Sequence, residues 1–224
     1  MNSHETNKTR RLLRTKGTMR RRMGLAVRIN SDAAGAILAP IYEALPKTMA
    51  TAHHNLTYGE IEWGALKRIA EYAEKQSGCS GTKFYDLGSG RGRAVLYMSL
   101  AGSFEQSVGI EILGERVKLS QEALQKLKLS IPTAGSKLRI YEASFLNPAF
   151  KYKDAKVIYV ANLCFDKQTQ DALFAKLSAE MPKGSLLFCS VLPDTLPGAF
   201  QAVATEPLPM SWIKESDVHV LRHL

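Results

Sequence analysis

Residues 83–93 read Lys-Phe-Tyr-Asp-Leu-Gly-Ser-Gly-Arg-Gly-Arg. The run 84–87 is short, apolar and aromatic, which is typical of a buried parallel strand. Three glycines, at positions 88, 90 and 92, predict a sharp turn, because glycine accepts positive φ values and lets the backbone approach a ligand closely. A helix is predicted from Arg93 to residues 101–102. The stretch therefore predicts a strand, a glycine loop and a helix whose first backbone N–H groups are free to attract a carboxylate or phosphate.

The glycine spacing separates two classes of cofactor. A dinucleotide-binding loop reads Gly-x-Gly-x-x-Gly, which would require glycine at position 93, where this chain has arginine. A second apolar run, 108–110, ends in Glu111, a position at which an acid can bind two ribose hydroxyls. Asp86, the glycine loop and Glu111 together fit a nucleoside that carries an amino-acid tail. The pattern therefore predicts S-adenosylmethionine as the cofactor.

The composition is that of a single α/β domain of 224 residues with 45% hydrophobic content. No apolar run approaches the ~20 residues that a membrane span needs, so no membrane contact is expected. The three cysteines, at positions 79, 164 and 189, include no Cys-x-x-Cys pair, so neither a disulfide framework nor a metal site is predicted. Free thiols point to an intracellular, reducing compartment.

Positive charge is concentrated at the start of the chain. Residues 1–28 contain nine basic side chains and one acid, and so account for most of the net charge of +9. This composition predicts a disordered basic tail, whose residues 8–28 are suited to nucleic acid, a nucleosome or a ribosome. An Arg-rich start also resembles a mitochondrial presequence or a nuclear import signal. Cytoplasm, nucleus and mitochondrion therefore all stay open as locations.

The rest of the chain alternates between predicted helices and strands. Residues 29–56 are predicted to form a helical and loop segment, with a helix at 32–45 broken at Pro40. An amphipathic helix is predicted over residues 63–73, and a further helix is predicted from Asp166, as its N-cap, to residue 181. Further strands are predicted at 138–141, 157–160, 185–189, 204–210 and 218–221. Such alternation predicts a mostly parallel sheet that is flanked by helices and binds ligands at the carboxyl ends of its strands.

Five motifs resemble the disruptor-of-telomeric-silencing (Dot-type, non-SET) family of histone lysine methyltransferases. They are Tyr58-Gly59-Glu60, Phe84 to Gly90, Gly109-Ile110-Glu111, Ser144-Phe145-Leu146 and Val157 to Phe165. The resemblance spans residues 57–224, and it implies a single Rossmann-like class I methyltransferase domain with a seven-stranded sheet.

The resemblance also implies which residues form the site. The residues that would hold the methyl donor are Tyr58, Glu60, Phe84, Asp86, Gly88, Gly90, Arg93, Glu111, Ser144 and Phe145. Tyr159 and Phe165 would wall the channel for the acceptor lysine. Asn162 would orient the acceptor amine through its side-chain carbonyl, or would leave this to backbone carbonyls if the side chain points away.

Three positions depart from the family pattern. Ser144 stands where the family has an aspartate, Ala161 replaces the first of two asparagines, and the tyrosine of the closing strand is replaced within residues 217–219. The sequence therefore predicts an S-adenosylmethionine-dependent protein lysine methyltransferase whose protein substrate is open. Two alternatives are an RNA methyltransferase and a catalytically silent module that binds nucleic acid or ribosomes. The Asn/Asp-Pro-Pro-aromatic signature of base-amine methylation is absent, which disfavours the first of these.

Overall fold

A seven-stranded sheet with strand order β3-β2-β1-β4-β5-β7-β6 forms the centre of the protein. The computed structural model describes residues 28–48, 59–75 and 77–224. The strands are β1 Lys83–Leu87, β2 Gln106–Glu111, β3 Leu138–Glu142, β4 Ala155–Val160, β5 Leu186–Cys189, β6 Phe200–Met210 and β7 Ile213–His223. The pairs among β1 to β5 are parallel, and β7 is antiparallel to both β5 and β6. This confirms the expected α/β class with a mostly parallel seven-stranded sheet.

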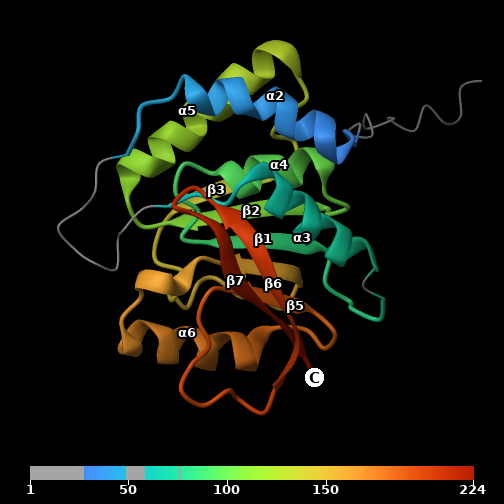
Figure 1. The fold of residues 1–224 in the computed structure, drawn as a ribbon, viewed down its shortest axis with the longest axis vertical. Helices are drawn as coiled ribbons and strands as arrows, with labels where there is room; N and C mark the ends of the chain where they lie inside the picture. Colours follow the sequence, from blue (N-terminus) through green and yellow to red (C-terminus); the bar gives the residue numbers. More distant parts are fainter. Residues whose placement is uncertain (1–27, 49–58, 76) are drawn as a thin grey trace, which may run out of the picture.

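Helices cover both faces of the sheet. They are α2 Ser31–Glu43, α3 Trp63–Lys75, α4 Arg93–Ala101, α5 Gly114–Ser130 and α6 Lys167–Glu180, with a short 3-10 turn, η2, at Asn162–Cys164. Helices α2 and α5 lie on the face opposite α6 (Figure 1). Because successive strand residues alternate between faces, Val157 and Tyr159 of β4 join the core under α2 to α5, whereas Ile158 and Val160 pack with α6.

The sequence predicted the start of α6 correctly but wrongly predicted a break within α2. The Asp166 side chain accepts a hydrogen bond from the Thr169 backbone N–H at 2.7 Å, which confirms it as the N-cap of α6. The predicted break at Pro40 is wrong, because α2 continues through Pro40 to Glu43. Burial of Leu38 and Tyr42 on one face of α2 stabilises the helix on both sides of the proline.

The last two strands are longer than the sequence predicted. Strand β6 begins at Phe200 and β7 at Ile213, and the two form a hairpin that extends well beyond the buried centre of the sheet. The residues of β7 that the prediction missed, 213–217, are mostly polar and exposed, so no hydrophobic alternation indicates a strand there. Its tip reaches the carboxyl-end edge of β4, where it becomes part of the site described below.

The N-terminal segment shares the core of the domain. Ala34, Leu38 and Tyr42 of α2 are buried in the same cluster as α3 and α4, and the backbone N–H of Ile29 donates to Leu100 O at 2.9 Å. Of the predicted basic tail, only Arg28 lies within the described residues, where its Nε donates to Ala101 O at 2.8 Å. Within the described residues, no helix combines the length and the apolar character needed to cross a membrane.

Candidate functional site

A cavity of about 480 Å³ opens at the carboxyl ends of β1, β2 and β4. Its walls come from residues within 59–61, 86–94, 111–116, 144–146 and 159–169, together with Trp212 at the hairpin tip. Pockets of this size hold cofactor-sized ligands. The place is the one that the parallel strand order predicts, because the loops after these strands converge at one edge of the sheet.

The glycine loop after β1 folds back on β2. Gly88 and Gly90 have φ values of +85° and +52°, which a residue with a side chain rarely adopts. The N–H groups of Gly88 and Ser89 both donate to Ile110 O, at 2.8 and 3.1 Å, and that of Gly92 donates to Ser89 O at 2.8 Å. These three N–H groups are therefore used within the loop and its contact with β2, and they are not offered to an anion. The backbone of the loop lines the cavity directly, with no large side chain between it and a ligand.

Glu111 is fixed by the same loop. Its Oε2 accepts from Gly90 N at 2.7 Å and its Oε1 accepts from Leu113 N at 2.9 Å. The side chain is buried, and it faces the cavity from the end of β2. A carboxylate oxygen can accept more than one hydrogen bond, so both oxygens retain capacity for ligand hydroxyls.

Asp86 and Glu111 place two buried acids side by side in the cavity wall. Burial and repulsion by the Glu111 charge raise the pKa of Asp86 to about 8 from its ordinary value of 3.8. Burial, followed by the charge of Asp86, also raises the pKa of Tyr159, so this phenol stays neutral. A pair of acids whose ionised forms repel each other favours a ligand that brings positive charge.

We expect the contribution of Asp86 to the stability of the ligand-free protein to decline as the pH rises from about 4 to about 8. The unfolded chain releases the Asp86 proton near 3.8, whereas the folded chain keeps it until about 8. Below both values the contribution to stability is complete, and between them it declines by up to ~1.4 kcal/mol per pH unit. Urea unfolding at several pH values measures this slope. Asp86→Asn should flatten it, whereas Asp217→Asn, at an exposed acid of β7, should not; equal slopes in all three proteins would contradict the assignment.

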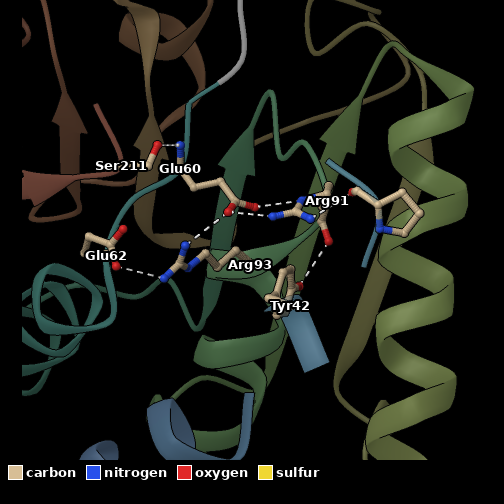
Figure 2. Close-up of polar contacts among 7 residues, drawn as sticks. Tyr42, Glu60, Glu62, Arg91, Arg93 and Ser211 are labelled. Carbon is tan, nitrogen blue, oxygen red and sulfur yellow. Dashed lines mark hydrogen bonds and ion pairs between the residues drawn. The ribbon is translucent and has the colours of Figure 1, made fainter. Parts of the chain in front are cut away.

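Glu60 and Arg93 enter the cavity as parts of an ion-pair network (Figure 2). Arg93 donates from Nη1 to Glu60 at 3.1 Å and from Nη2 to Glu62 at 3.0 Å, and its guanidinium lies 3.9 Å above the Trp63 ring. Glu60 is also held by Arg91, through Nε at 3.0 Å and Nη2 at 2.8 Å. The carboxylate of Glu60 therefore pairs with two arginines. This role differs from that of an acid that binds a ligand cation directly.

Aromatic and uncharged side chains line much of the cavity. The rings of Phe145 and Phe165 stack with centroids 5.4 Å apart, and Tyr159, which pairs with Asp86 in the register of β1 and β4, also lines the cavity. Ser144 also lines the cavity, with its Oγ accepting from Leu146 N at 3.2 Å. Ala161, Leu163, Cys164, Thr169 and Trp212 also belong to this lining.

Two of the predicted side chains point elsewhere. The Asn162 side chain is fully buried, with its nitrogen donating to Gln170 Oε1 and Val191 O and its oxygen accepting from the N–H groups of Ser190 and Val191. It therefore ties η2 to the loop after β5, and the first of the two alternatives for Asn162 is wrong. Phe84 is also fully buried, against Phe104, because it lies one pleat deeper than Asp86 on the same strand face.

Tyr58, predicted to contact the methyl donor, lies outside the described residues. The other predicted donor-site residues, Glu60, Asp86, Gly88, Gly90, Arg93, Glu111, Ser144 and Phe145, all line the cavity. The sequence reasoning missed Trp212 and Ile112, which line it as half-exposed apolar side chains. Ile112 follows Glu111 directly and could have been found from that position, whereas nothing local marks Trp212.

Solved structures with similar folds support the architecture. A candidate RNA methyltransferase from Pyrococcus horikoshii has a TM-score of 0.58 and 13% identity over 86% of this chain and 99% of its own. TrmN from Thermus thermophilus has a TM-score of 0.54 and 18% identity over 71% of this chain and 48% of its own. An RNA methyltransferase from Salinibacter ruber, in complex with S-adenosyl-L-homocysteine, has a TM-score of 0.49 and 16% identity over 71% of this chain and 90% of its own. The first two show the fold alone.

The sequence comparisons are more specific. No curated protein matches the chain. The family model of the histone methylation protein DOT1 matches residues 43–190, which is more than half of the chain and includes the glycine loop, both buried acids and the aromatic wall. The chain therefore belongs to the DOT1 family, and it is an S-adenosylmethionine-dependent methyltransferase with a Rossmann-like class I fold.

Proposed function

We propose that this methyltransferase transfers its methyl group to a lysine side chain of a protein. The observation that carries the proposal is one cavity that is lined both by two buried acids, Asp86 and Glu111, and by aromatic side chains that include Tyr159 and Phe165. The acids suit a cationic nucleoside donor. The aromatic side chains suit an amine that must lose its charge.

The chain's own residues fit the donor. Glu111, held by two backbone N–H groups, would accept from the ribose hydroxyls, and Asp86 would accept from the ammonium of the amino-acid tail. Phe145 and Ile112 offer apolar surface for the adenine ring, and Ser144 lies next to it with a weaker acceptor than the family's aspartate. When bound, S-adenosylmethionine supplies an electrophilic methyl group on a positively charged sulfur.

The aromatic wall would prepare the acceptor. A lysine attacks only as the neutral amine, and desolvation lowers its pKa because burial disfavours the ammonium form. Tyr159 and Phe165 would displace water from the amine, and the neutral Tyr159 phenol itself adds no charge that would hold the proton on the lysine. With the Asn162 side chain turned away, orientation of the amine would fall to backbone carbonyls, as in the second alternative, or to the Tyr159 hydroxyl, which lines the cavity.

The acceptor class can be tested directly. The purified protein is incubated with S-adenosylmethionine labelled in the methyl group and, separately, with histones, nucleosomes, total protein and RNA. We expect label in a protein fraction, in a form that amino-acid analysis identifies as methyl-lysine. Label in RNA alone would refute the lysine proposal and favour the RNA alternative, whereas no label in any fraction would favour the silent binding module.

Phe165→Ala is expected to lower turnover by roughly tenfold or more while changing donor affinity little, because a misplaced acceptor loses rate and not donor contacts. Turnover is measured with the labelled fraction found above, and donor affinity by calorimetry with S-adenosylhomocysteine. Tyr141→Ala is the matched control, since Tyr141 is an exposed aromatic outside the cavity. Normal turnover in the Phe165→Ala enzyme would show that Phe165 does not take part in binding the acceptor.

A further inference from the structure

Arg91 is buried in the glycine loop without lining the cavity. It is 7% exposed, and its guanidinium binds two segments at once. Nε and Nη2 donate to the two carboxylate oxygens of Glu60, and Nη1 donates to Pro46 O at 3.0 Å. The Tyr42 hydroxyl in turn donates to the Arg91 carbonyl at 3.0 Å (Figure 2). A buried arginine with this many partners fixes the position of what it binds.

Glu60 connects this arginine to both sides of the cavity. On the donor side, its Oε2 also accepts from Arg93, which lines the cavity beside the glycine loop. On the other side, its backbone N–H donates to Ser211 Oγ at 2.9 Å and its carbonyl accepts from Ser211 N at 2.7 Å. The same stretch pairs with β6 through an antiparallel bridge between Ile61 and Met210.

The hairpin tip is held closely at this point. A Cβ atom on Gly59 would lie 2.1 Å from a ring carbon of Trp212, so the indole packs directly on the glycine backbone. Because Trp212 follows Ser211, its place in the cavity wall depends on the backbone of residues 59 and 60. The positions of Arg93 and of Trp212 therefore both depend on Glu60.

We propose that Arg91 is a positioning residue that, through Glu60, links the donor side of the cavity to the hairpin tip carrying Trp212. The Glu60 side chain is only 10% exposed, so its placement relies on its arginine partners. The guanidinium of Arg91 donates two hydrogen bonds to the Glu60 carboxylate and so sets its direction. A lysine at this position, with one point charge, would not set that direction. Occupation of the donor side then changes the environment of Trp212, and by linkage the reverse also holds.

This link rests on the proposed donor site, and intrinsic fluorescence tests it. The chain has two tryptophans, at positions 63 and 212, so Trp63→Phe leaves Trp212 as the single reporter. In this parent we expect saturation with S-adenosylhomocysteine to change the Trp212 emission. Arg91→Met should weaken binding by about tenfold and abolish the emission change at saturation, and Arg91→Lys should give an intermediate result. Arg68→Met is the control, because Arg68 is exposed and contacts the same hairpin at Pro207 O without touching Glu60.

The outcomes separate the link from the donor site. If Arg91→Met binds S-adenosylhomocysteine as the parent does, with the same emission change, the link is wrong, and Trp212 responds only to direct contact with the ligand. If Arg91→Met does not fold, Ser211→Ala weakens the same path at its hairpin end, because it removes the Oγ acceptor of the Glu60 N–H and leaves the bond from Ser211 N to Glu60 O in place. It should retain binding and reduce the emission change, and an unaltered emission change would overturn the proposal. Failure of the folded parent to bind S-adenosylhomocysteine would instead refute the donor site.

Discussion

Glu111→Ala is expected to weaken S-adenosylhomocysteine binding by roughly 100-fold or more. Two hydrogen bonds from ribose hydroxyls to a buried carboxylate would be lost, and bonds to charged groups contribute about 1.5–3 kcal/mol each. The Glu111 carboxylate is already oriented by Gly90 N and Leu113 N, so little ordering opposes binding. Calorimetry with S-adenosylhomocysteine, which keeps the ribose and the amino-acid tail, measures the loss.

Glu142 provides a matched control for this experiment. It pairs with Glu111 in the register of β2 and β3, so it is an acid at the same level of the sheet, but it is exposed and lies outside the cavity. Glu142→Ala should therefore bind S-adenosylhomocysteine as the wild type does. A folded Glu111→Ala protein with unchanged affinity would show that the donor site has been misplaced.

Binding of S-adenosylhomocysteine at pH 7 is expected to release close to one proton, which comes from Asp86. The pKa of this carboxyl is about 8 in the ligand-free protein, so at pH 7 the group is mostly protonated. The ammonium of the ligand favours the ionised carboxylate and lowers its pKa, so the proton leaves on binding. Affinity should consequently rise by up to about tenfold per pH unit between pH 6 and 8.

Calorimetry in two buffers of different ionisation enthalpy counts the released protons. Asp86→Asn should bind roughly 10-fold or more weakly at pH 8 and release none, because a charge-assisted hydrogen bond is replaced by a neutral one. Proton release that persists in Asp86→Asn would assign the titration to another group. A wild type that releases no proton would mean that Asp86 does not meet the ammonium.

Much of the donor site could be predicted from the sequence because its signals are local. Gly88 and Gly90 mark the turn after a buried strand, and Asp86 and Glu111 each stand at or next to the end of an apolar run. Parallel strands bring such ends to one edge of a sheet, so the sequence predicts that the loops after these strands lie together. The family motifs then added the aromatic wall.

The directions in which side chains point could not be predicted from the sequence. Phe84 and Asp86 share one face of β1, yet one is closed over by helices and the other opens into the cavity. Asn162 occurs in a matching motif, but Ser190, Val191 and Gln170 satisfy its amide. Residues 1–27 of the basic tail lie outside the described part of the chain, so contact of the tail with nucleic acid, a nucleosome or a ribosome stays a prediction.

By itself, the sequence determined the fold class, the cofactor and the two acids that are proposed to hold it, because each depends on periodicity and on residues near one another in the chain. Only the tertiary structure decided how the two sides of the cavity are joined. Glu60 pairs with Arg91, 31 positions away, and with Ser211, 151 positions away. The hydrophobic periodicity of the sequence does not indicate such contacts, since they exist only where the packed sheet brings the glycine loop and the hairpin tip to the same edge.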